Sequence, residues 1–141
     1  MQSLNFKTNV KTYAINGDEN TVIKINTTDY SLIDRIRTLK ENIGERMKKY
    51  EEMPPEEVTP TVFSDADRDI RGEIDRVFGE NVSQGAFGDV NCLSVCDDGS
   101  MLFENFLGAV VPVILEDLQG VQSKLNNHIE KYLNQAQRLA P

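Results

Sequence analysis

The residues that could do chemistry in this chain are two cysteines and a single histidine. Cys92 and Cys96 lie four positions apart, and His128 follows much later in the chain. A zinc site needs three or four Cys or His ligands, so this set is too small. A nucleophilic Ser or Cys needs a neighbouring base, usually His, and no motif surrounds His128. We interpret the cysteines as half-buried structural thiols and expect no catalytic residue and no metal.

The acidic and glycine-rich segments also fail the tests for ligand sites. Residues 97–100 (DDGS) with Glu104 do not match the register of an EF-hand loop, and they predict a turn that caps the following helix. Gly79, Gly85 and Gly88 are followed by no Gly-Lys-Ser/Thr sequence and do not fit the dinucleotide fingerprint. We expect these glycines to end helices, and we expect no cofactor.

The carboxylates of residues 65–75 are interleaved with arginines. Arg68, Arg71 and Arg76 stand among five acidic residues, a pattern typical of an exposed helix face crossed by salt bridges. A hydrolase would need some of these carboxylates in a pocket. The sequence gives no indication of one, so we expect a protein that is not an enzyme.

Composition indicates a single acidic domain over residues 1–141. The chain has 141 residues, 39% hydrophobic and 27% charged, with a net charge of −8 and a pI near 4.6. Such a surface repels phosphate backbones, so we expect no nucleic acid. The first ten residues contain no apolar signal region, and residues 107–115, the longest apolar run, are too short to cross a bilayer. We expect no membrane contact and a location in the cytoplasm.

Hydrophobic periodicity predicts an α+β fold: an antiparallel β-hairpin or three-stranded sheet packed on a mainly helical body. Residues 11–15 and 21–25 alternate polar and apolar around the turn 16–20 (NGDEN), and residues 4–8 are a candidate third strand. The predicted divisions are a β-ribbon over 1–27, a helix over 28–52, a proline-rich linker over 53–63 and a helical body over 64–141.

Caps and apolar spacing predict the individual helices. Thr28 or Asp29 should cap the first helix, and Ser64 should open the second through a capping box. A short helix should occupy residues 82–87. Residues 101–118 are apolar on almost every side, which is typical of a central core helix or an interface helix. After Gly120 the spacing returns to an ordinary amphipathic stripe.

Five segments follow one another in an informative order: 11–16 (KTYAIN), 22–26 (VIKIN), 29–35 (DYSLIDR), 74–79 (IDRVFG) and 87–91 (FGDVN). With the apolar helix after them, they resemble the tail assembly chaperones of long-tailed, siphovirus-type bacteriophages and prophages of Gram-positive hosts. The resemblance spans roughly residues 10–118. Residues 119–141 differ from the shorter, less charged tail usual in that family.

The resemblance implies a non-enzymatic chaperone that binds and solubilises the tape-measure protein during tail assembly. Its partners would be a tape-measure-like protein and possibly the tail-tube protein, together with self-association. A structural tail protein, or another self-associating virion protein, is the alternative. The apolar excess of the late helices favours partner binding by these residues: Phe103, Phe106, Val110, Val113, Ile114, Leu118, Val121, Leu125 and Tyr132.

Overall fold

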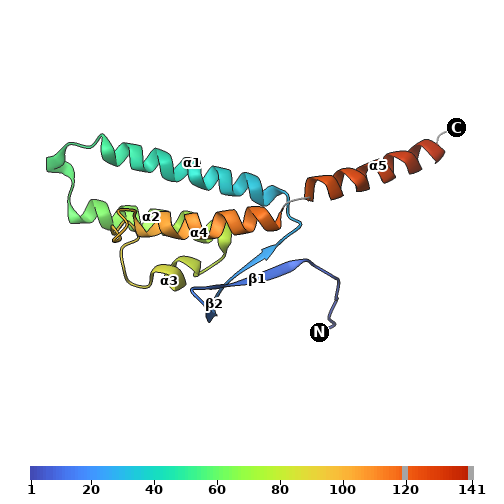
Figure 1. The fold of residues 1–141 in the computed structure, drawn as a ribbon, viewed down its shortest axis with the longest axis horizontal. Coiled ribbons are helices and arrows are strands. Elements are labelled where there is room, and N and C mark those ends of the chain that lie inside the picture. The colour runs from blue at the N-terminus through green and yellow to red at the C-terminus, as the bar shows by residue number, and fades with distance from the viewer. Residues whose placement is uncertain (119–120, 140–141) are drawn as a thin grey trace.

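The fold is α+β, as the periodicity predicts: a two-stranded antiparallel hairpin followed by a helical body (Figure 1). The computed structural model describes residues 1–118 and 121–139. Residues 4–8 form no strand, so the sheet is the hairpin alone. The elements in chain order are β1 (Val10–Ile15), β2 (Asp18–Asn26), α1 (Ser31–Glu51), the 3-10 turn η1 (Pro55–Glu57), α2 (Pro60–Phe78), α3 (Val82–Phe87), α4 (Leu102–Asp117) and α5 (Val121–Leu139).

The hairpin turn depends on two residues with left-handed backbone. Asn16 has φ 51° and Gly17 has φ 76°, which suits the right-handed twist of the flanking strands. The register pairs Tyr13 with Ile23. Because side chains alternate along a strand, Ile23 and Ile25 enter the core while Lys24 faces solvent.

Helices α1 and α2 pack side by side with their apolar stripes facing inward (Figure 1). The predicted cap of α1 is displaced, because the helix begins at Ser31 with Tyr30 before it. The carboxylate of Asp29 accepts bonds from the backbone N–H and hydroxyl of Ser31, at 3.1 and 2.6 Å. Asp29 thus supports the turn before α1 without being the cap residue.

Helix α2 begins at Pro60, and the predicted start at Ser64 is wrong. The hydroxyl of Thr59 accepts a bond from the N–H of Val62 at 3.4 Å. Proline fits the first helical position because no N–H is needed there. Residues 60–63, the last four of the predicted linker 53–63, therefore belong to α2, and Ser64 lies inside the helix.

Helix α4 closes the core with one of its sides. Phe103, Phe106, Val111 and Ile114 are buried, whereas Val113 is 46% exposed. The sequence left open a central core helix or an interface helix, and in the structure α4 has one buried side and exposed apolar residues, among them Val113 and Leu115. Helix α3 has the predicted bounds, 82–87, and Gly79 and Gly88 end α2 and α3. The prediction for Gly85 is wrong, because this glycine lies inside α3 and ends no helix.

Helix α5 continues beyond the helical body (Figure 1). Its described side chains, residues 124–134, are all exposed. They include Leu125 at 45%, Ile129 at 47% and Tyr132 at 74%. The amphipathic stripe expected after Gly120 is present, and within the described chain nothing covers it.

Candidate functional site

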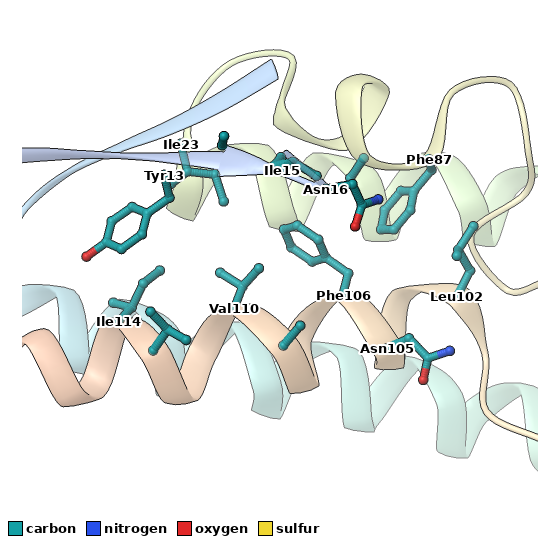
Figure 2. Close-up of a pocket in the computed structure, with 14 residues that line it drawn as sticks. Tyr13, Ile15, Asn16, Ile23, Phe87, Leu102, Asn105, Phe106, Val110 and Ile114 are labelled. Atoms are coloured by element: carbon teal, nitrogen blue, oxygen red, sulfur yellow. The ribbon is translucent and has the colours of Figure 1, made fainter. Parts of the chain in front are cut away.

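An apolar cavity of about 450 Å³ lies between the β-hairpin and α4, and we refer to it as the groove. Figure 2 shows the hairpin and α3 on one side and α4 on the other, with Tyr13 opposite Ile114 and Phe87 beside Phe106. The groove is lined by Tyr13, Ala14, Ile15, Asn16, Ile23, Ala86, Phe87, Leu102, Asn105, Phe106, Ala109, Val110, Val113 and Ile114.

The floor of the groove is a rigid aromatic cluster. The ring of Phe106 meets the ring of Phe78 edge-on at 5.8 Å between centroids, and that of Phe87 at 5.5 Å. Such edge-to-face pairs add about 0.5–1.5 kcal/mol beyond burial of their area. Ile23 and Ile114 beside them are both 1% exposed. The floor is therefore set by the core of the protein and does not depend on a ligand.

The open side of the groove is made mostly of aliphatic side chains from α4. Val113 is 46% exposed, Ala109 is exposed and Val110 is partly exposed. The side-chain amides of Asn16 and Asn105 are the polar groups of the lining near the hairpin turn. An apolar helix or strand could therefore place side chains in the groove and form hydrogen bonds at one end.

Two polar contacts attach β1 to the last turn of α4 at the other end of the groove. The hydroxyl of Tyr13 donates to a carboxylate oxygen of Asp117 at 2.5 Å, and Lys11 Nζ lies 2.8 Å from the same oxygen. Burial, followed by the bond to Asp117, raises the pKa of Tyr13 to about 12. The hydrogen bonds from Lys11 and Tyr13 lower the pKa of Asp117. These contacts fix the separation of the two groove walls.

A polar network holds the loop that connects α3 to α4. Asp67 accepts bonds from the backbone N–H of Cys92 at 2.8 Å and from Arg71 Nε at 2.9 Å. The guanidinium of Arg71 also donates to the carbonyls of Gly88 and Val90. Burial acts to raise the pKa of Asp67, but the bonds from Cys92 and Arg71 prevail and the pKa is lowered. Asp67 and Arg71 therefore hold this loop in place.

A second network joins α2 to its neighbours. Glu73 is buried, and its carboxylate accepts bonds from Asn42 Nδ2 at 3.2 Å and from Arg76. Asp75 accepts the N–H and hydroxyl of Ser83 at 2.8 and 3.0 Å. The prediction that residues 65–75 form an exposed charged face is thus wrong for most of them, because other elements supply partners. The salt bridge between the exposed side chains of Asp65 and Arg68 agrees with the prediction.

The cysteines and the histidine do not come together with acidic groups into a metal site. Cys92 is buried, Cys96 is partly exposed and His128 is exposed on α5. In the residues that the structure describes, no group of three or more His, Cys, Asp or Glu is placed to hold a metal ion. Burial, then the hydrogen bond to Asp67, raises the pKa of Cys92 to about 12, which suppresses its reactive thiolate.

The acidic segment 97–100 forms the predicted turn before α4. The carboxylate of Asp98 accepts the N–H of Ser100 at 2.9 Å, and Gly99 has φ 85°. The carboxylate of Glu104 accepts the N–H of Met101 at 3.0 Å, so it covers a free amide at the helix start.

The structure places the predicted partner-binding residues in three settings. Phe106, Val110, Val113 and Ile114 line the groove, and Phe103 and Leu118 are buried in the core. Leu125 and Tyr132 are exposed on α5, and the side chain of Val121 lies outside the described residues.

The sequence interpretation missed the opposite wall of the groove, which the hairpin supplies. Tyr13 and Ile15 lie two positions apart in β1 and so share one face of the strand. That alternation was the available signal. It could not show that this face meets α4, whose sequence position is about ninety residues later.

The comparisons with known proteins returned no match. No protein-family model, no curated protein and no solved structure matches this chain. Among the described helices, none has the length and apolar character that a bilayer crossing requires.

Proposed function

We propose that this protein is a non-enzymatic tail assembly chaperone of a long-tailed bacteriophage or prophage. It binds apolar segments of the tape-measure protein in the host cytoplasm and keeps them soluble until the tail tube encloses them. The groove between the hairpin and α4 carries the proposal, because it is a preformed apolar site with an aromatic floor. The resemblance of residues 10–118 to that family supplies the identity of the client.

The volume and lining of the groove suit one amphipathic client segment. Such a segment would insert apolar side chains at helical spacing between Tyr13 and Val113, as in helix-in-groove recognition. Contact of this kind is mostly apolar, so salt should weaken it little.

The excess of acidic residues in the sequence from α3 to the end of α4 favours a client with basic flanks. Between Arg76 and Lys124 the chain has seven acidic residues and no Lys or Arg. Glu116 and Asp117 belong to this segment and lie at the end of α4. Opposite charges beside an apolar contact guide the encounter and fix its orientation.

The test is co-expression with the tape-measure protein of the same phage or prophage, followed by pull-down at low and high salt. Val113→Glu places a charge on the open side of the groove. We expect it to reduce the retained client by at least about tenfold, since one fully buried aliphatic side chain corresponds to that factor or more. Val95→Glu is the matched control, because Val95 is 68% exposed and outside the groove.

Three results would contradict the proposal. The first is a parent protein that retains no client at either salt concentration. The second is retention of equal amounts of client by Val113→Glu and Val95→Glu. Alternatively, a proteomic scan would find this protein in purified particles at the level of the tube subunit, which would identify it as a structural tail component.

A further inference from the structure

Helix α5 presents an apolar stripe that has no partner in the described chain. Leu125, Ile129 and Tyr132 follow the spacing of one helix face, and each is at least 45% exposed. A helix of 19 residues standing alone in water is marginal, because most helical stability in proteins comes from packing an amphipathic face. The stripe therefore needs a surface to cover it.

The groove has the dimensions and chemistry of such a surface. Its α4 wall runs from Leu102 to Ile114, about 18 Å at the rise of an α-helix. The stripe from Leu125 to Tyr132 covers about 10 Å on the same rise, so it fits within the groove. Both surfaces are apolar, and the aromatic floor is already in place.

The charges of the two elements are complementary. Residues 119–141 contain three basic residues and one acidic residue, whereas residues 77–118 contain seven acidic residues and no basic one. Lys124 and Lys131 are seven positions apart and exposed, so they flank the stripe on one side of α5. Glu116 is exposed at the end of the groove, where it forms no salt bridge with the described residues. The two exposed lysines beside the stripe also disfavour pairing of α5 with another α5.

We propose that α5 of one copy lies in the groove of a second copy, and that the exchange is reciprocal. In the structure α5 runs away from the hairpin and α4 of its own chain (Figure 1), so its own groove stays open. Reciprocal docking gives a closed two-fold dimer with two identical contacts. The same groove would serve a client, so client binding and self-association compete. The dimer itself does not depend on the proposed function.

The experiment uses sedimentation of full-length variants at micromolar concentration. Val113→Glu disables the groove, and Leu125→Glu with Ile129→Glu disables the stripe. Each should raise the dimer dissociation constant by at least about tenfold. An equimolar mixture of the two variants should recover heterodimers, because one intact groove then meets one intact stripe. Lys124→Glu with Lys131→Glu should also weaken the dimer, most clearly at low salt, and Lys24→Glu with Lys40→Glu is the matched control.

The outcomes separate this inference from its alternatives. A parent protein that stays monomeric overturns it, as would be the case if α5 folds onto its own chain. A dimer that survives Val113→Glu also overturns it, because α5 would then pair with α5. The exposed lysine variants keep the test decisive even if Val113→Glu fails to fold. A monomer that still retains the tape-measure client refutes only the dimer, and a dimer without a client refutes only the chaperone proposal.

Discussion

The hydroxyl of Tyr13 donates a hydrogen bond to the carboxylate of Asp117 and thereby joins residues from the first strand and the fourth helix. The two residues are 104 positions apart in the sequence, so the contact is entirely a product of tertiary packing. It stands at one end of the groove and keeps the hairpin against α4.

The first prediction concerns this hydrogen bond. Tyr13→Phe should lower the free energy of unfolding by about 0.5–1.5 kcal/mol, because the mutation removes one partly buried bond and leaves its acceptor. Urea denaturation measures the change. Tyr30→Phe is the control: Tyr30 is 42% exposed, and its hydroxyl has no hydrogen-bond partner among the described residues, so no change is expected. Equal effects of the two mutations would contradict the structure.

The second prediction concerns acid pH. The pKa of Asp67 is lowered in the folded protein, so its carboxylate contributes stability above the unfolded value of about 3.9. That contribution is lost as the pH falls through the lowered folded pKa. Asp67→Asn should therefore destabilise the protein at neutral pH and reduce the loss of stability between neutral pH and the acid range. Urea midpoints at several pH values measure this, with Asp65→Asn on the same helix as the control.

The third prediction concerns close packing between α3 and β2. A Cβ atom on Gly85 would lie 2.1 Å from Cγ2 of Thr21. Thr21 is β-branched, and its hydroxyl donates to Asp18 at 3.1 Å, so it cannot rotate freely. Gly85→Ala should cost about 1–3 kcal/mol of stability. Adding Thr21→Ser removes the clashing methyl and should recover part of the loss.

A matched glycine on α1 provides the control for this clash. Gly44 is helical, and a Cβ atom there would meet nothing within 4 Å. Gly44→Ala should therefore stabilise the protein by about 0.5–1 kcal/mol. Stabilisation of similar size at both glycines would show that helix propensity, and not contact with Thr21, governs the result.

The fourth prediction concerns the two thiols. Cys92 is fully buried and its pKa is raised to about 12, whereas Cys96 is partly exposed. A disulfide reagent near neutral pH should therefore modify one thiol rapidly, and the second only upon unfolding. Cys96→Ser should abolish the rapid phase, and Cys92→Ser should leave it intact. Rapid modification of both thiols in the folded protein would contradict the burial of Cys92.

Local sequence signals predicted the positions of the helices and strands better than they predicted which side chains are buried. The alternation beside Asn16 and Gly17 located the hairpin, and the glycines after α2 and α3 located their ends. The start of α2 was misplaced because two capping signals compete within five residues, and the Thr59–Pro60 signal prevails over Ser64. The buried state of Glu73 was not predictable from its own helix.

Only the α4 wall of the groove was predictable, because local sequence signals do not show which elements pack together. The apolar excess of α4 indicated a surface in need of a partner, and four of the residues singled out for partner binding line the groove. The opposing wall comes from the hairpin, and no local pattern relates Tyr13 or Ile15 to a helix so distant in the sequence.

The absence of Lys and Arg between Arg76 and Lys124 has a practical consequence for proteolysis. Trypsin cleaves after basic residues, so it has no site in α3, in α4 or in the loop that joins them. Arg71 and Arg46 are held in polar networks, whereas Lys124 and Lys131 are exposed. Brief digestion of the native protein should therefore cut first at Lys7, which is exposed before β1, and within α5, and leave α3 and α4 uncut. Occupancy of α5 by any partner should slow its trimming and leave the cut at Lys7 unchanged.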